Sequence, residues 1–432
     1  MVEHVTENHG VGGSIPPLGT SPAHSHAGGM ASTGLTRSQS GGLTSTGIPG
    51  ESEGPRGHPA AILDLPTPAL LLDRTRLERQ AERMRDKVRT LGVTLRPHVK
   101  TAKSIDVLRV LSGGGDVPIT VSTLAEARYF FAHGVTDILY AVGIAPVKLP
   151  EAAALIRAGC KLRLILDTPE AADAVRAFAE AEGVAIEVLI EIDSDGHRAG
   201  VAPGDPLLIE IGRRLATGLA GVMTHAGASY DCRTRDEFEA MAEQERALTV
   251  EAAERLGAAG LPCPIVSVGS TPTLHYARNL DGVTEARAGV YAFGDLVQAE
   301  LGTCSIDDVA IGVLASVIGH NRQHGRVLID AGFLALSRDR GTADLPVDWG
   351  YGAVCDAATG AVIDHVTVSS TNQEHGIITS GSGAIDFGRF PVGSRVRILP
   401  NHACATAAAH DRYFVTDGGD AIVDVWERVN GW

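Results

Sequence analysis

Lys100, in the stretch LRPHVKTAKS, is the first residue in the chain whose type and position suggest covalent chemistry. It follows an apolar strand-like segment and has His98 and Thr101 as near neighbours. An amine held at the end of a strand can attack a carbonyl group and form a Schiff base. A surface lysine that ends a strand is the more common explanation when such a residue is taken alone. The prediction therefore depends on the motifs that accompany it.

The small-residue turn VGSTPT at 268–273 follows directly after an expected strand. Such a turn presents backbone N–H groups and hydroxyls, which are the groups that bind phosphate. Barrels of eight βα units often hold a phosphate after their seventh and eighth strands. By our count this turn follows the seventh strand, and Gly289 and Val290 end the eighth. An ordinary connecting turn stays the alternative for this motif by itself.

Two histidines and a cysteine suggest further roles. His225, in THAGASYD, stands at the end of a strand where it could pack on a flat ring, although a structural histidine is an equally good interpretation. His402 and Cys404 stand two residues apart in PNHACAT, so in a strand they would point to the same face. Imidazole nitrogen and thiolate are good zinc ligands, and two of them leave positions open for water and substrate. A buried cysteine beside a hydrogen-bonded histidine is the alternative.

The elements that must position these residues form a repeated pattern. From about Leu65, β-branched runs alternate with Ala/Glu/Arg-rich segments at a spacing of roughly 25–30 residues, which indicates βα units and a parallel sheet. Eight units favour a closed (β/α)8 TIM-type barrel over an open sheet. The expected strands are 94–100, 119–122, 137–142, 161–166, 186–192, 219–225, 264–269 and 284–290. Polar residues collect where these strands end, the rim at which barrel active sites form: Lys100, Ser122, Asp193, His225, Ser270 and Thr271.

The segments before and after this region differ from it in amino-acid composition and in the pattern of apolar residues. Residues 1–58 are rich in Gly, Ser, Thr, Pro and His, which predicts a disordered tail. After about Thr303, alternating apolar and polar residues with Gly and Asn turns predict a C-terminal all-β domain, a barrel or a sandwich. We therefore expect a tail at 1–58, the α/β barrel at 59–303 and the β domain at 304–432.

The overall composition excludes several classes of function. A net charge of -15 in 432 residues argues against nucleic acid and acidic membrane surfaces as partners. No apolar run approaches the roughly 20 residues that span a bilayer, and the first residues do not read as a signal peptide. Six dispersed cysteines without a CxxC pair do not form a disulfide framework, so we expect a cytoplasmic protein.

Eight motifs occur in an order that resembles the D-serine dehydratase/D-threonine aldolase family: RPHVKT, VSTLAEA, DGHRAGV, THAGASY, VGSTPT, EARAGVYAFGD, DAGFLALSRDR and PNHAC. This family belongs to the alanine-racemase-like, fold type III enzymes that use pyridoxal 5'-phosphate. The resemblance covers the chain from about Leu65 to its end. As a set the motifs are specific, and RPHVKT and PNHAC are strong even singly. One departure is Ala102, at a position where family members often carry a histidine.

The resemblance implies a role for each matching residue. Lys100 would hold pyridoxal phosphate as a Schiff base, His225 would stack on the pyridine ring, and Arg198 would contact the phenolic oxygen. Arg287 stands where racemases place an arginine on the pyridine nitrogen, although relatives vary there. The remaining cofactor-binding residues would be Tyr230, the phosphate-binding Gly269, Ser270, Thr271, Gly289 and Val290, and Tyr291 near the phosphate.

The metal motif indicates the reaction. Dehydratases of the family carry a histidine and a cysteine where aldolases tend to carry a histidine and an aspartate, so His402 and Cys404 imply zinc or another divalent metal. We therefore expect a lyase that dehydrates a β-hydroxy D-amino acid such as D-serine to a keto acid and ammonia. The family resemblance also implies a homodimer. A metal-dependent aldolase that gives glycine and an aldehyde is the alternative. A non-catalytic protein of pyridoxal phosphate homeostasis is the alternative from another class.

Overall fold

A parallel eight-stranded sheet forms the first part of the computed structural model, which describes residues 60–432. The tail expected at 1–58 lies outside these residues. The strands follow the order β2-β9-β8-β7-β6-β5-β4-β3, and a parallel bridge between His98 and Thr120 joins the two ends into a barrel. Their bounds are β2 (Thr94–Leu95), β3 (Ile119–Val121), β4 (Asp137–Gly143), β5 (Lys161–Leu166), β6 (Glu187–Ile192), β7 (Leu219–Thr224), β8 (Ile265–Val268) and β9 (Glu285–Ala286). The predicted barrel is confirmed.

The first and last barrel strands, β2 and β9, are much shorter than the sequence predicts. Regular pairing of β2 with β9 stops at Leu95 and Ala286. Pro97, two residues after the end of β2, has no N–H to donate. Hydrogen bonds nevertheless continue past both strands, from Arg96 N to Ala286 O (2.9 Å) and from His98 N to Ala288 O (2.8 Å). The two segments that carry Lys100 and Gly289 therefore leave the barrel side by side.

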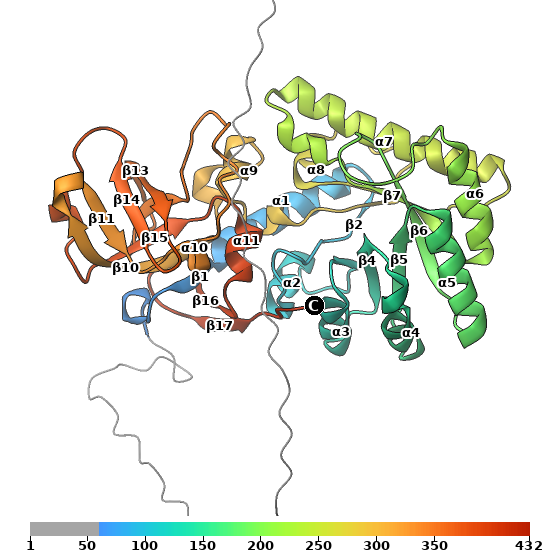
Figure 1. Cartoon of the computed structure of the whole chain (residues 1–432), viewed down its shortest axis with the longest axis horizontal. Coiled ribbons are helices and arrows are strands. Elements are labelled where there is room, and N and C mark those ends of the chain that lie inside the picture. The colour runs from blue at the N-terminus through green and yellow to red at the C-terminus, as the bar shows by residue number, and fades with distance from the viewer. Residues whose placement is uncertain (1–59) are drawn as a thin grey trace, which may run out of the picture. The chain divides into compact units, whose positions relative to one another are not determined.

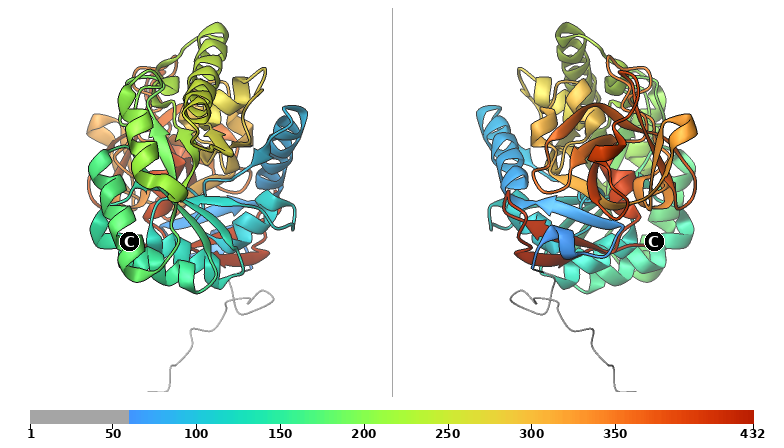
Figure 2. Two further views of the ribbon diagram at one scale, coloured as in Figure 1. Left: turned by 90° about the vertical axis from the view of Figure 1, so that its right-hand side faces the viewer. Right: turned by 90° about the vertical axis from the view of Figure 1, so that its left-hand side faces the viewer.

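Helices on the outside of the sheet connect its strands (Figures 1 and 2). Most begin at a side chain that caps the first turn; Thr234 and Glu237, for example, form a reciprocal capping box at the start of the longest helix. The helices are α1 (Arg74–Thr90), α2 (Ile105–Ser112), α3 (Leu124–Ala132), α4 (Leu149–Arg157), α5 (Pro169–Glu182), α6 (Pro206–Leu215), α7 (Arg235–Ala258), α8 (Thr271–Tyr276) and α9 (Leu296–Glu300). Within residues 60–432, none has both the length and the apolar character that crossing a membrane requires.

A second sheet, of nine strands, contains the C-terminal part of the chain. Strand β10 pairs with both β11 and β15, so the six strands β10-β11-β14-β13-β12-β15 close into a ring. The bounds are β10 (Ile311–Asn321), β11 (Arg326–Ile329), β12 (Ala353–Asp356), β13 (Val362–Thr371), β14 (Gly376–Ser380), β15 (Arg395–Leu399), β16 (Arg412–Thr416) and β17 (Asp424–Glu427). Two short helices, α10 (Phe333–Leu336) and α11 (Ala403–Ala408), interrupt it. The expected β domain is thus a closed ring with an extension.

The first strand of the chain, β1 (Ala69–Asp73), belongs to this second sheet although it precedes the whole barrel. It pairs antiparallel with β10 and parallel with β16, and Figure 1 shows it beside β16 and β17. Each of its five residues, ALLLD, is buried, which is typical of a strand covered on both faces. The segment that leads into α1 is therefore anchored in the C-terminal sheet.

Candidate active site

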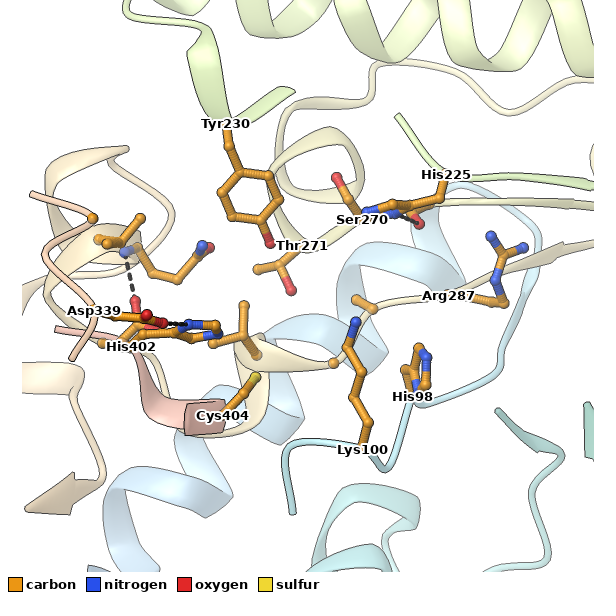
Figure 3. A pocket seen from close by; sticks show the side chains of 18 of the residues that line it. His98, Lys100, His225, Tyr230, Ser270, Thr271, Arg287, Asp339, His402 and Cys404 are labelled. Atoms are coloured by element: carbon orange, nitrogen blue, oxygen red, sulfur yellow. Dashed lines mark hydrogen bonds and ion pairs between the residues drawn. The ribbon is translucent and has the colours of Figure 1, made fainter. Parts of the chain in front are cut away.

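One cavity of about 770 Å³ collects residues from the barrel rim and from the β domain (Figure 3). It is lined by nearly all the residues that the sequence singles out: Lys100, Arg198, His225, Tyr230, Gly269, Ser270, Thr271, Arg287, Gly289, Val290, His402 and Cys404. Tyr291 does not line it. A polar cavity at the carboxyl ends of barrel strands is the usual place for a barrel active site.

Lys100 is exposed to the open space of this cavity, and His98 lies beside it (Figure 3). The buried Nδ1 atom of His98 has no hydrogen-bond partner among the described residues. Burial, together with the positive charges of Lys100 and Arg287, holds the pKa of His98 well below its usual value, so the ring is neutral. Sequence reasoning gave His98 no role. His98 forms the bridge to Thr120, and Lys100 follows it in a turn, so closeness to Lys100 in the sequence is the signal that could have identified His98.

His225 follows β7 and faces the same space. Its Nδ1 atom lies 3.4 Å from the Gly269 carbonyl oxygen. Burial, and after it the charge of Lys100, lowers the pKa of His225 to about 4. Neutral at physiological pH, the imidazole can pack on a flat ring without carrying a charge into the cavity. Burial also raises the pKa of the Tyr230 phenol, which therefore stays protonated at physiological pH. Figure 3 shows Tyr230 above His402 and Cys404.

The turn after β8 has the features of a phosphate-binding site. Gly269 adopts a φ of +127°, and a Cβ atom there would collide with the Arg287 carbonyl, so only glycine fits. Ser270 caps α8 by accepting from Thr273 N at 3.2 Å, and Thr271 Oγ1 accepts from Tyr291 N at 3.2 Å. The Tyr291 ring instead lines a neighbouring cavity of about 500 Å³, where its buried hydroxyl has no partner among the described residues.

Two arginines of the cavity are held by barrel residues. The buried Arg287 guanidinium donates to the Thr224 carbonyl and to Ser267 Oγ (2.5 Å), and Ser267 Oγ donates to Glu285 Oε1 (2.7 Å). Arg198 is more exposed and forms an ion pair with Glu191 at 3.2 Å. Burial lowers the pKa of Arg287 from its usual value, and the charges of Glu285 and Glu245 oppose that effect.

His402 and Cys404 lie at the start of α11 rather than in a strand. The expectation of a strand is wrong here because β15 ends at Leu399 and the Ala-rich stretch ACATAA favours a helix. His402 is the residue that precedes the helix and Cys404 is its second residue, yet both line the cavity. The Cys404 Sγ atom lies 3.0 Å from Thr101 Oγ1, next in sequence to Lys100.

The charges around this pair raise the pKa of His402 and lower that of Cys404. Burial by itself lowers the pKa of His402, but hydrogen bonding to Cys404 and the carboxylates of Asp295 and Asp339 raise it to about 10. Burial works against the Cys404 thiolate, and hydrogen bonds from His402 and Thr101 outweigh it, so its pKa lies below the usual value. A thiolate is the form in which cysteine binds a metal.

Two aspartates that the sequence did not single out support the pair. Asp339 Oδ2 lies 2.5 Å from His402 Nδ1, and buried Asp295 accepts from Ala403 N (2.9 Å) and Gln298 N (2.8 Å). Asp339 belongs to the motif DAGFLALSRDR, but nothing in the sequence connects it with a histidine 63 positions later. Within residues 60–432 no group of three or more His, Cys, Asp or Glu side chains is arranged to hold a metal.

Comparisons with known proteins match both halves of the chain. Residues 72–297 match the alanine racemase N-terminal domain, and residues 310–416 match a putative serine dehydratase domain. D-threo-3-hydroxyaspartate dehydratase of Delftia sp. (strain HT23) is 53% identical over 378 residues, which cover 86% of this chain and 99% of that protein. The chain belongs to the D-serine dehydratase/D-threonine aldolase family.

Two further members of this family extend the comparison. D-serine dehydratase of Dictyostelium discoideum is 30% identical over 394 residues, covering 86% of this chain and 98% of that protein. A solved structure of a D-threo-3-hydroxyaspartate dehydratase variant, with a cysteine changed to alanine and in the metal-free form, is 52% identical. It superposes with a TM-score of 0.83 and covers 86% of this chain and all of that one (100%). Like these dehydratases, the chain is a lyase.

Proposed function

We propose that this lyase uses pyridoxal phosphate and zinc to eliminate water from a β-hydroxy D-amino acid, giving a keto acid and ammonia. The observation that carries the proposal is that the Lys100 amine and the His402–Cys404 pair line one cavity although they come from two domains. Elimination requires a base at the α-carbon and assistance for hydroxide, a poor leaving group, at the β-carbon. The activities named for relatives at 53% and 30% identity agree with this reaction.

The residues around Lys100 fit pyridoxal phosphate. The unpartnered Nδ1 of His98 is a buried polar atom that a bound molecule would satisfy. The neutral His225 ring suits contact with a pyridine face, and the glycine-dependent turn with the Ser270 and Thr271 hydroxyls suits a phosphate. When bound, pyridoxal phosphate supplies an electron sink for the pair left at the α-carbon.

The chain's own groups then divide the work. Lys100 Nζ would hold the cofactor, and its free amine would take the α-proton of the substrate. Arg198 would contact the phenolic oxygen of the cofactor, and Arg287, fixed by Thr224 and Ser267, lines the same cavity. Neutral His98 and His225 flank Lys100 without competing for the proton at physiological pH.

His402 and Cys404 fit a zinc ion with an open coordination shell. Asp339 engages His402 Nδ1, so Nε2 would be the nitrogen that binds the metal once it has lost the proton shared with Cys404, and the pKa of Cys404 lies below its usual value. When bound, the metal supplies a Lewis acid for the departing hydroxide. The relative whose cysteine-to-alanine variant is described as metal-free agrees with a cysteine ligand.

Product analysis tests the reaction. The protein is incubated with D-threo-3-hydroxyaspartate, D-serine and D-threonine, and the products are scored for keto acid with ammonia and for glycine with an aldehyde. We expect keto acid and ammonia. Glycine and an aldehyde would identify the aldolase alternative, and a bound cofactor without turnover of any of the three would favour the non-catalytic alternative.

The visible absorbance of the purified protein tests the cofactor lysine. Lys100→Ala should abolish the absorbance band of covalently held pyridoxal phosphate, because no other amine lines the cavity among the described residues. Lys161→Ala, an exposed lysine on β5, is the matched control and should keep the band. A band that persists in Lys100→Ala would refute the assignment.

Chelation tests the metal separately. Removing the metal should stop elimination and leave the cofactor absorbance unchanged, because Lys100 and the His402–Cys404 pair lie on different domains. Activity should return with added zinc. Full turnover by protein shown to be free of metal would overturn the role of His402 and Cys404.

A further inference from the structure

The loop that follows α10 is attached to the His402–Cys404 segment at two points. Asp339 Oδ2 lies 2.5 Å from His402 Nδ1. Figure 3 marks this contact with a dashed line. Three residues later, Thr342 N donates to Asn401 Oδ1 (3.1 Å) and Asn401 Nδ2 donates to Thr342 Oγ1 (3.0 Å), both in buried positions. Arg340 lies between these attachments, so its backbone is fixed beside the two donors.

The Arg340 side chain lines the cavity and is only partly engaged by its neighbours. Its Nη2 atom pairs with Asp348 Oδ2 at 2.5 Å, and its guanidinium carbon lies 5.7 Å from the centre of the Tyr351 ring. With 43% of the side chain exposed, the guanidinium is not enclosed by these contacts. A guanidinium has five N–H donors, so one carboxylate partner leaves donors for a second.

The other arginines of the cavity have partners that direct them elsewhere. Arg287 is buried against Thr224 and Ser267 at the carboxyl ends of the barrel strands. Arg198 pairs with Glu191 and, in the proposed function, is taken up by the phenolic oxygen of the cofactor. Arg233 donates to the carbonyl oxygens of Tyr230 and Cys232, both at 2.9 Å. Arg340 is the arginine that the β domain contributes to this cavity, on the same domain as His402 and Cys404.

We propose that Arg340 binds a carboxylate on the β-carbon of the substrate, and so favours 3-hydroxyaspartate over serine. The inference rests on the proposed function. In 3-hydroxyaspartate the hydroxyl and the second carboxylate are attached to the same carbon, so a hydroxyl directed at His402 and Cys404 brings the carboxylate to the same wall. Bidentate recognition of a carboxylate is what an arginine does better than any other side chain.

Arg340→Gln tests this role, and Arg338→Gln is the matched control. Arg338 is in the same loop, stacks on the Phe333 ring at 4.1 Å and does not line the cavity. We expect Arg340→Gln to lower the ratio of kcat/KM for D-threo-3-hydroxyaspartate to that for D-serine by about 10- to 100-fold, mostly through KM. Arg340→Lys, which keeps the charge without the planar fork, should fall between. Arg338→Gln should keep the wild-type ratio.

Binding of unreactive acids gives a readout that does not depend on turnover. D-malate has two carboxylates and D-lactate has one, and calorimetry on the holoenzyme should show that Arg340→Gln weakens binding of D-malate more than that of D-lactate. An unchanged kcat/KM ratio, or equal losses for both acids, would overturn the role of Arg340 while the proposed function stands. Wild-type protein that turns over neither amino acid would instead contradict both proposals.

Discussion

His402 is held at its Nδ1 atom by Asp339, which is half exposed, with 47% of its side chain accessible. A carboxylate on the second nitrogen of a metal-binding histidine fixes the ring orientation and makes the ligating nitrogen more basic. In this chain the carboxylate comes from a different loop, which is itself attached to Asn401. The geometry of the donor pair therefore depends on residues that the donor motif does not contain.

Asp339→Asn should weaken zinc binding by about 10- to 100-fold, because the amide cannot supply the negative charge that supports the imidazole. The measurement is a zinc titration of metal-free protein by competition with a chromophoric chelator. Asp348→Asn, on the same loop but paired with Arg340, is the control and should bind zinc like the wild type. Equal affinity in Asp339→Asn would exclude this support.

Two neutral histidines make stability depend on pH. The pKa of His225 in the folded chain is about 4 and that of His98 is also lowered, whereas both are about 6.5 when unfolded. Between these values the unfolded chain binds more protons, so their stabilising contribution is complete above pH 6.5 and declines as the pH falls toward 4.

Urea unfolding between pH 7 and 4.5 measures this dependence. We expect the free energy of unfolding to fall with acidification, and to fall less steeply in His225→Asn, which has no proton to bind. Parallel slopes for the two proteins would show that His225 is not held neutral by the fold.

Among the elements, α9 and α11 are joined by one carboxylate. Asp295 accepts from Gln298 N in the first turn of α9 and from Ala403 N in the first turn of α11, and its side chain is buried. Burial raises the pKa of Asp295, and these N–H groups together with the charge of His402 oppose that effect. This contact holds the start of α11, with its cysteine, against the end of the barrel.

Asp295→Ala should lower the free energy of unfolding by about 2–4 kcal/mol, because two buried N–H groups lose their acceptor. Asp295→Asn keeps one acceptor oxygen and should lose less. Equilibrium unfolding in urea measures both. A change below about 0.5 kcal/mol in Asp295→Ala would show that water replaces the carboxylate at both helices.

Local patterns in the sequence predict much of the barrel and little of what crosses between domains. The alternation of β-branched and Ala/Glu/Arg-rich segments predicts the eight strands. The rule that barrel active sites form at the carboxyl ends of strands predicts which residues belong to the site. The helix that begins after His402 was missed because the two-residue spacing of His402 and Cys404 is compatible with one face of a strand and also with the start of a helix. The Asp339–His402 contact, the orientation of Tyr291 and the partners of Asp295 depend on how distant segments pack, which no local pattern encodes.

For the molecule as a whole, β1 is the strand whose place in the sequence differs from its place in the fold, because it precedes the barrel but belongs to the C-terminal sheet. This strand fills the place between β10 and β16, so the second sheet needs the start of the described chain to be complete. Residues 304–432 were expected to form a domain of their own, and they include every strand of that sheet except this one. Because β1 is an interior strand with a partner on each side, the sheet cannot be continuous without it.

A chain that begins at Arg74, and so lacks β1, should lose cooperative unfolding of the β domain. A chain that begins at Ala60 keeps the strand and is the control. Thermal unfolding followed by circular dichroism distinguishes the two. An equally sharp transition in the shorter chain would show that β10 and β16 can pair or be covered without β1.

The position of β1 also has a consequence during synthesis on the ribosome. Its antiparallel partner β10 emerges roughly 240 residues later, and at about 5–20 residues per second the strand waits for tens of seconds. Throughout that interval a run of four apolar residues, ALLL, has no sheet to join. Nascent chains of this protein should therefore depend on chaperones that cover apolar segments until translation is nearly complete.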